Sequence, residues 1–280
     1  METQLRKKLI ERALKNHVIR FFGPGLLREA ALYALFSGGK RIRPLLAFTV
    51  GEGLGADRKK LVAFGCALEL IHNYTLIHDD LPAMDNDDYR RGKLTVHKKF
   101  GEACAILLGD AFLTHAFELL AELQSPKLSC LVARAIGGRG VILGQVLDLG
   151  LGQNGKDAKS LDFINQLKTA KLFEAAIVGA GFVAAKSPSP SLVKSLRAFA
   201  ILFGRCFQLA DDLADWRDES KKKVITTAVA MGEQETTRSL RTLLKQLERQ
   251  INRLAIKPNT RQQISSLAHT LYAQKAQAAA

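Results

Sequence analysis

The chain has 280 residues, 47% of them hydrophobic, and its 41 Lys and Arg residues outnumber 27 Asp and Glu residues to give a formal net charge of +14. This length can bury a large core, and charge or glycine interrupts the longest apolar stretches before the ~20 residues that a membrane span needs. The N-terminal segment includes acidic residues, unlike a signal peptide, and four widely spaced cysteines show no CxxC pair. We therefore expect a soluble protein in the reducing cytoplasm, with buried cysteines.

Apolar residues recur every three or four positions in about ten segments, and prolines separate most of these segments. The predicted helices cover residues 2–20, 26–36, 43–53, 58–79, 101–123, 128–149, 161–185, 191–216, 232–256 and 260–276. No convincing run of alternating strand residues occurs, so the predicted fold class is all-α.

Two aspartate clusters follow apolar helical segments. HDDLPAMDND contains Asp79, Asp80 and Asp85, and FQLADDLAD contains Asp211, Asp212 and Asp215. Carboxylates next to an apolar helix are costly to bury unless a cation compensates them. One such cluster is more often a solvated helix end, but two clusters in one chain favour a shared metal ion. Mg²⁺ fits best, since it prefers one or two carboxylates together with water and phosphate oxygens.

The spacing within each cluster adds a geometric prediction. On an unbroken helix Asp79 and Asp85 would point roughly 240° apart. Pro82 should end the helix and let the chain turn, so that Asp85 returns toward Asp79. Asp211 and Asp215 are four residues apart and share one helical face.

Basic side chains accompany the first cluster. SGGKRIRP provides Lys40, Arg41 and Arg43, and YRRGK provides Arg90 and Arg91. Arginine forks match phosphate oxygens in a bidentate manner, and lysine adds a point charge. His72 lies seven residues before Asp79 and should share its helical face.

Taken in order, SGGKRIRP, IHNYTLIHDDLPAMDNDDYRRGK, GEACAILLGD, GQVLDL, the KTA at Lys168 to Ala170, and FQLADDLAD resemble trans-prenyl diphosphate synthases, in particular short-chain bacterial farnesyl or geranylgeranyl diphosphate synthases. The resemblance runs from about Gly38 to Asp215. It implies one helical domain of the isoprenoid synthase type over residues 1–280, with ten or more helices around a central cavity. It further implies a homodimer that uses about three Mg²⁺ ions per site, with Mn²⁺ as a substitute.

The resemblance also implies roles for individual residues. Asp79, Asp80, Asp85, Asp211 and Asp212 would hold Mg²⁺ on an allylic diphosphate, supported by Asp215; Lys40, Arg43, His72 and Arg91 would bind isopentenyl diphosphate; and Arg90, Lys168, Thr169 and Gln208 would bind on the allylic side. The expected catalytic residues are these aspartates other than Asp215, together with Arg90 and Lys168. Neutralising the leaving pyrophosphate lowers the barrier to breaking the allylic carbon–oxygen bond, and a dry cavity orients the second substrate.

Product length should depend on the residues one turn before the first aspartates, Tyr74 and Thr75. An aromatic ring at Tyr74 could close the pocket, so the predicted product is farnesyl diphosphate, with geranylgeranyl or geranyl diphosphate as the alternative. The chain also departs from the family pattern, since WRDESKKKVITT is shortened and leaves Lys221, Lys222 and Lys223 as candidate diphosphate contacts, of which Lys223 is the one assigned. That departure admits a weakly active or regulatory subunit.

Two other interpretations compete with this one. His78 and Asp79 could form the dyad of an HD-type metal phosphohydrolase, although the second aspartate cluster would then have no role. A stripe of basic residues occupies one face of the C-terminal helical region: Arg238, Arg241, Lys245, Arg249, Arg253 and Lys257. A solvated basic face explains it best. Weak contact with an anionic membrane is the minority alternative, and no nucleic-acid partner is expected because few aromatic residues interleave with the stripe.

Overall fold

The computed structural model describes residues 2–151, 158–216 and 227–277. The chain forms two compact units. Unit 1 consists of Met1–Phe48 and Ala56–Ser129, and unit 2 consists of Thr49–Gly55 and Cys130–Ala280. Nearly every described element is a helix, which confirms the predicted all-α class.

The first half of the chain contains α1 (Glu2–Phe21), α2 (Leu26–Phe36), α3 (Ile42–Gly53), α4 (Arg58–Asp79), β1 (Tyr89–Arg90), β2 (Lys93–Leu94), α5 (Val96–Phe100), α6 (Glu102–Glu122) and α7 (Pro126–Ile136). The second half contains α8 (Val141–Asp148), α9 (Ala158–Asn165), the π-helical turn η1 (Gln166–Ala170), α10 (Lys171–Ala184), α11 (Pro190–Trp216), α12 (Thr227–Met231), α13 (Glu233–Arg253) and α14 (Pro258–Gln277).

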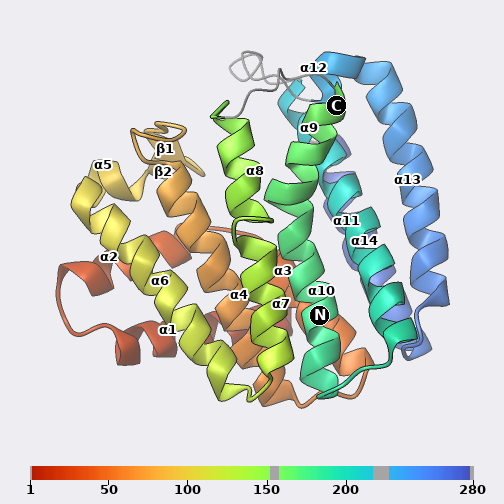
Figure 1. Ribbon diagram of the computed structural model, residues 1–280, viewed down its shortest axis with the longest axis horizontal. Helices are drawn as coiled ribbons and strands as arrows, with labels where there is room; N and C mark the ends of the chain where they lie inside the picture. Colours follow the sequence, from red (N-terminus) through yellow and green to blue (C-terminus); the bar gives the residue numbers. More distant parts are fainter. Residues whose placement is uncertain (1, 152–157, 217–226, 278–280) are drawn as a thin grey trace. The chain divides into compact units, whose positions relative to one another are not determined.

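The core of unit 1 forms where α4 and α6 lie side by side (Figure 1). Phe64 from α4 and Phe112 from α6 are fully buried. The two helices approach closely at Gly109, where an added Cβ atom would lie 2.0 Å from Nε2 of His78. A glycine on α6 therefore makes room for a polar side chain near the end of α4.

The core of unit 2 surrounds α11, which packs against α10, α13 and α14. Phe173 of α10 contacts Phe203 of α11 with ring centroids 5.1 Å apart, and both rings are fully buried. The hydroxyl of Tyr272 in α14 donates to the carbonyl oxygen of Phe203 at 3.1 Å. The long helix α11 carries the second aspartate cluster at its C-terminal end.

The structure differs from the predicted elements in several places. The short hairpin β1–β2 and the helices α5 and α12 were not predicted. Glycine-rich residues 137–140 divide the predicted helix 128–149 into α7 and α8. The predicted helix 161–185 includes the π-helical turn η1. The apolar periodicity of the sequence cannot reveal such a wider turn.

The structure corrects the expectation that the cysteines are buried, and it qualifies the expectation that no apolar stretch is long enough to span a membrane. Cys66 and Cys206 are buried as expected, but Cys104 is only partly buried and Cys130 is exposed; all four cysteines are free. Two stretches, Glu102–Glu122 and Pro126–Asp148, are long and apolar enough to cross a membrane by length and composition alone. The first is α6, half of whose tested residues are buried within the structure; the second is interrupted at residues 137–140.

Candidate functional site

The first aspartate cluster lies where α4 ends and the chain turns. α4 stops at Asp79, and the backbone N–H of Asp85 donates to the carbonyl oxygen of Asp79 at 2.8 Å. Asn86, with φ +54°, donates in turn to the carbonyl oxygen of Leu81 at 3.1 Å. As predicted from Pro82, the chain folds back and brings Asp85 beside the end of α4.

Asp80 is buried, with 3% of its surface exposed, and it is held by an arginine. Arg90 Nε donates to Asp80 Oδ1 at 2.6 Å, and Arg90 also pairs with Asp87 at 3.3 Å. Burial raises the pKa of the Asp80 carboxyl above its ordinary value, and the bond from Arg90 opposes this rise. A carboxylate at this depth is stable because a cation stands next to it.

The hairpin β1–β2 positions Arg90 and Arg91. Arg91 and Gly92 form its two-residue loop with φ of +54° and +74°, the conformation of a type I′ turn. The hydroxyl of Tyr33 in α2 donates to the carbonyl oxygen of Leu94 at 2.8 Å and anchors β2. The glycine after two arginines was the sequence signal that could have revealed this hairpin.

The predicted isopentenyl-side residues of unit 1 gather beside α4. Arg43 Nη1 lies 3.4 Å from His72 Nε2, and Arg91 Nη1 donates to the carbonyl oxygen of Gly38 at 2.8 Å. Lys40 is exposed on the same loop. Burial and the arginines Arg43 and Arg91 lower the pKa of the His72 imidazole well below its ordinary value. His72 is therefore neutral near pH 7 among several permanent positive charges.

Tyr74 and Thr75 lie one turn deeper in α4. The Tyr74 side chain is buried and packs edge-on against His78, with ring centroids 5.9 Å apart. Its hydroxyl has no hydrogen-bond partner among the described residues, and burial, with the nearby charge of Asp79, raises its pKa to about 12. Thr75 Oγ1 donates to the carbonyl oxygen of His72 at 2.8 Å. His78 itself points to α6, with Nε2 3.1 Å from the carbonyl oxygen of Ile106.

The second cluster in unit 2 is organised by a relay of side chains. Thr169 Oγ1 donates to Gln208 Oε1 at 2.8 Å, and Gln208 Nε2 donates to Asp212 Oδ1 at 2.8 Å. Asp212 is 2% exposed, whereas Asp211 and Asp215 are partly buried on the same helix. The relay joins η1 to the aspartates of α11.

Lys168 lies on η1 and pairs with a residue that the sequence interpretation missed. Lys168 Nζ lies 2.8 Å from Oδ2 of Asp148, the last residue of α8. The two segments can approach because Gly144 lacks a side chain; a Cβ atom there would lie 2.7 Å from the backbone nitrogen of Lys168. Asp148 is the acidic residue of the GQVLDL motif, and that motif was the available signal.

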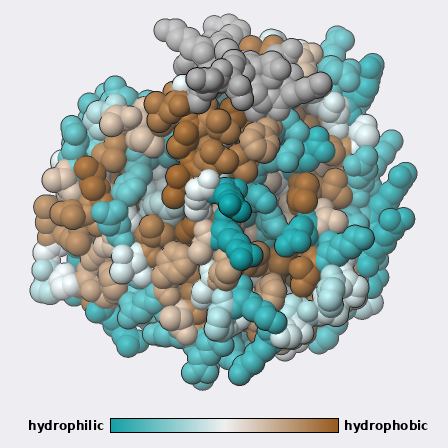
Figure 2. All heavy atoms as spheres, viewed as in Figure 1, coloured by the Kyte–Doolittle hydropathy of each residue, from teal (hydrophilic) through white to brown (hydrophobic). Residues whose placement is uncertain are grey.

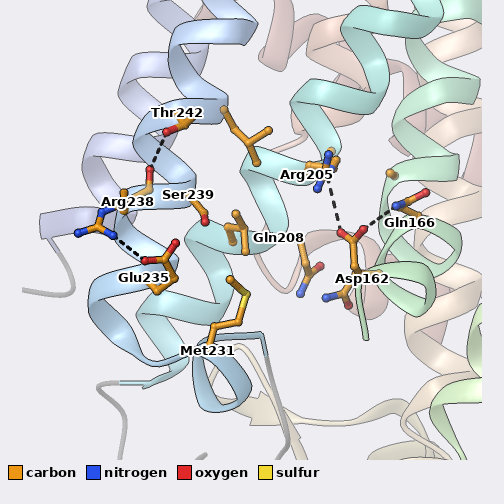
Figure 3. A pocket seen from close by; sticks show the side chains of 14 residues that line it. Asp162, Gln166, Arg205, Gln208, Met231, Glu235, Arg238, Ser239 and Thr242 are labelled. Atoms are coloured by element: carbon orange, nitrogen blue, oxygen red, sulfur yellow. Dashed lines mark hydrogen bonds and ion pairs between the residues drawn. The ribbon is translucent and has the colours of Figure 1, made fainter. Parts of the chain in front are cut away.

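A cavity of about 550 Å³ lies in unit 2 between η1, α11 and α13 (Figure 3). Asp162 accepts a bond from Gln166 at 2.8 Å and lies 3.6 Å from Arg205 on one side, while Glu235 pairs with Arg238 at 3.0 Å on the other. Among the predicted site residues that the structure describes in unit 2, only Gln208 lines this cavity. The cavity thus reaches the relay at Gln208 but is not lined by Asp211, Asp212 or Asp215.

The donor set fits Mg²⁺ under one condition. No three carboxylate, imidazole or thiolate groups within residues 2–151, 158–216 and 227–277 stand ready to hold a metal ion by themselves. Mg²⁺ needs only one or two carboxylates where substrate phosphate supplies further oxygens. The aspartates therefore suit a metal ion that arrives with a diphosphate. Lys223 lies outside the described residues.

Comparison with known proteins assigns the chain. The polyprenyl synthetase family model matches residues 24–265. The chain is 38% identical over 225 residues to farnesyl diphosphate synthase of Geobacillus stearothermophilus, covering 78% of this chain and 75% of that enzyme. It is 43% identical over 208 residues to the chloroplastic geranylgeranyl pyrophosphate synthase 7 of Arabidopsis thaliana, covering 71% of this chain but 59% of that protein.

A solved structure agrees over nearly the whole length. The geranyltransferase of Legionella pneumophila superimposes with a TM-score of 0.83 at 32% identity, covering 99% of each chain. The order of the motifs, the all-α fold and these relatives lead to the same assignment, which leaves the HD-type phosphohydrolase interpretation without support. The chain belongs to the polyprenyl synthetase family and is a trans-prenyltransferase.

Proposed function

We propose that this enzyme condenses dimethylallyl or geranyl diphosphate with isopentenyl diphosphate, head to tail, to give farnesyl diphosphate and pyrophosphate in an Mg²⁺-dependent reaction. The observation that carries the proposal is the match to a farnesyl diphosphate synthase at 38% identity over 78% of the chain. The polar groups of both units support it, since carboxylates and arginines are the residue types that a metal diphosphate requires.

Within unit 1, Asp79, Asp80 and Asp85 would hold Mg²⁺, and Arg90 would turn from Asp80 toward the allylic diphosphate. Lys40, Arg43, His72 and Arg91 would bind isopentenyl diphosphate. Contacts within unit 1 support this division: Arg90 bonds Asp80, whereas Arg43 lies beside His72 and Arg91 bonds the carbonyl oxygen of Gly38.

Within unit 2, Asp211 and Asp212 would hold Mg²⁺ with support from Asp215, and Lys168, Thr169 and Gln208 would bind the allylic diphosphate. Bound Mg²⁺ supplies Lewis-acid neutralisation of the departing pyrophosphate. Lys168 and Arg90 add positive charge to the same leaving group, and the apolar residues around Tyr74 keep water from the allylic carbon. One domain over residues 1–280 is part of this proposal.

The main product is proposed to be farnesyl diphosphate because the buried Tyr74 ring occupies the space one turn before the aspartates. A longer product is the second candidate, and it is favoured by the 43% identity to a geranylgeranyl pyrophosphate synthase. The two candidates differ in one measurable quantity, the chain length released.

The test is an incubation of the purified enzyme with radiolabelled isopentenyl diphosphate and each allylic starter in turn, with Mg²⁺, with Mn²⁺ and with a chelator. We expect labelled farnesyl diphosphate only when a divalent ion is present. Labelled C20 product would select the second candidate, and no condensation with any starter would refute the proposal and favour a regulatory subunit.

Three further expectations accompany the proposal. A homodimer is supported by exposed apolar residues on α6, since Ile106 and Leu107 are 45% and 60% exposed; light scattering of the purified enzyme tests it.

The basic stripe is exposed along α13, where Figure 2 shows a hydrophilic edge. We interpret it as a solvated face, and co-sedimentation with anionic liposomes at low salt tests the membrane alternative. Cytoplasmic location stays a prediction.

A further inference from the structure

Arg41 stands between two residues that are proposed to bind isopentenyl diphosphate, yet it cannot touch a substrate. Lys40 is exposed and Arg43 is partly buried, whereas the side chain of Arg41 is only 1% exposed. Its Nη1 atom lies 2.7 Å from Oε1 of Glu69 in α4, whose side chain is 2% exposed. An ion pair is thus buried directly beneath the proposed binding loop.

The buried guanidinium joins several elements of unit 1. Arg41 Nη2 donates to the carbonyl oxygen of Leu35 at the end of α2, and Nε lies 3.3 Å from Oε1 of Glu11 in α1. Glu69 Oε1 also accepts a bond from Asn73 Nδ2 at 3.2 Å. The loop between α2 and α3 is consequently attached to α1, α2 and α4 through one side chain.

The backbone shows why such an attachment is needed. Arg41 has φ +55°, in the left-handed region, which is strained for a residue with a Cβ atom. Residues keep such a conformation when the surrounding structure fixes it. The bonds to Glu69 and Leu35 offset this strain and thereby determine the direction in which Lys40 and Arg43 leave the loop.

The ion pair of Arg41 and Glu69 also affects Arg91, because Arg41 and Arg91 pack against the same glycine. A Cβ atom on Gly39 would lie 2.7 Å from Arg91 Nη1 and 2.8 Å from Arg41 Nη1, so both guanidinium groups pack against this glycine. Burial lowers the pKa of Arg91, Glu69 opposes this effect, and the charge of Arg41 adds to the lowering. Glu69 is therefore the buried anion that allows two guanidinium groups to stand so close together.

We propose that Arg41 and Glu69 are positioning residues for the isopentenyl diphosphate pocket: their buried ion pair fixes residues 38–43 so that Lys40, Arg43 and Arg91 converge on one diphosphate. The inference rests on the proposed function and assigns neither residue a contact with substrate. It distinguishes a geometric role from a purely electrostatic one, and the two roles predict opposite changes in affinity.

The variant Glu69→Gln separates the two roles because it keeps the shape of the side chain and removes its charge. If Glu69 acted only as a counter-charge, its neutralisation would make the pocket more positive and lower the KM for isopentenyl diphosphate. A positioning role predicts that this KM rises about ten-fold or more, while the KM for the allylic diphosphate stays within about two-fold. The sign of the change decides between them.

Two further variants keep the test valid if Glu69→Gln folds poorly. Arg41→Lys keeps the charge but cannot bond Glu69 and Leu35 together, so the KM for isopentenyl diphosphate should still rise. The double variant Arg41→Met with Glu69→Leu replaces a buried ion pair by apolar groups, a change that is often neutral for stability. It should fold and show the same rise in KM.

Glu174→Gln is the matched control, since Glu174 is a buried carboxylate of unit 2 that pairs with Arg197 at 2.7 Å. It should lower the unfolding temperature without changing either KM.

Calorimetric binding of isopentenyl diphosphate to metal-free enzyme gives a readout that does not depend on turnover. If the wild-type enzyme binds isopentenyl diphosphate but does not condense it, the proposed function fails, whereas the effect of each substitution on the Kd for isopentenyl diphosphate can still be measured. An unchanged or lower KM and Kd in Glu69→Gln and the double variant would overturn the positioning role.

Discussion

The two clusters differ in the group that contacts one aspartate of each: a charged guanidinium beside a backbone turn in unit 1, and a neutral amide from the same helix in unit 2. In unit 1 Asp80 contacts the guanidinium of Arg90, and in unit 2 Asp212 contacts the amide of Gln208. The first arrangement depends on charge and on loop geometry. The second depends on the register between η1 and α11. Substitutions that remove charge should therefore affect the two units differently.

The largest expected effect comes from the charge of the first cluster. Asp80→Asn removes a proposed metal ligand and also releases Arg90, so kcat should fall by about 10³, equivalent to roughly 4 kcal/mol of lost transition-state stabilisation. Asp212→Asn leaves a neutral amide beside Gln208 and should cost less, about 10². Initial rates at saturating substrates measure both.

Asp57→Asn is the control for this pair, because Asp57 is the N-cap of α4 at the opposite end of the same helix. Asparagine caps a helix as well as aspartate does, so rate and stability should stay unchanged. Equal losses in Asp80→Asn and Asp212→Asn would show that the contact with Arg90 adds nothing, and the contrast between the units would fail.

The next effect concerns the lysine of unit 2. Lys168→Ala should raise the KM for the allylic diphosphate by about 10² and leave that for isopentenyl diphosphate nearly unchanged. Asp148→Asn removes the partner at 2.8 Å but keeps the lysine, so the rise should be closer to ten-fold. Lys171→Ala is the matched control, since Lys171 pairs with Glu174 instead. A change confined to isopentenyl diphosphate would reverse the assignment.

A smaller change in rate, but a clear change in product, is expected at Tyr74. Tyr74→Ala empties the space of a buried ring, so chromatography should detect products longer than farnesyl diphosphate. Tyr74→Phe keeps the ring and should keep the product length. It also removes a buried hydroxyl without a described partner, which should stabilise the fold by about 1 kcal/mol. Unchanged products from Tyr74→Ala would show that another residue limits chain length.

The smallest effect is a dependence of stability on pH. The folded protein lowers the pKa of His72, so the unfolded chain binds the proton first as pH falls below 6.5. The stabilising contribution is complete above pH 6.5 and declines as pH falls toward the folded pKa, by at most about 1.4 kcal/mol per pH unit. Urea unfolding from pH 7.5 to 5 should show a shallower decline in His72→Gln than in wild type. His269→Gln, at an exposed position, should behave like wild type.

Much of this architecture could be predicted because local sequence determined it. The end of α4 at Asp79 and the return of Asp85 follow from apolar periodicity and from Pro82. The remaining features depend on contacts between distant residues. Arg41 looks like another phosphate ligand in the sequence, and only its bond to Glu69, 28 residues away, shows that it is buried. The pair of Lys168 and Asp148 is likewise 20 residues apart.

The π-helical turn η1 makes the length of its segment a constraint on evolution. A π turn holds one residue more than the α-helical turn it replaces, so every residue before it is rotated by about 100° relative to an uninterrupted helix. Deleting a single residue between Gln166 and Ala170 would restore regular winding while displacing Asp162 from Arg205. Relatives that share this π-helical turn are therefore expected to keep the length of the segment unchanged.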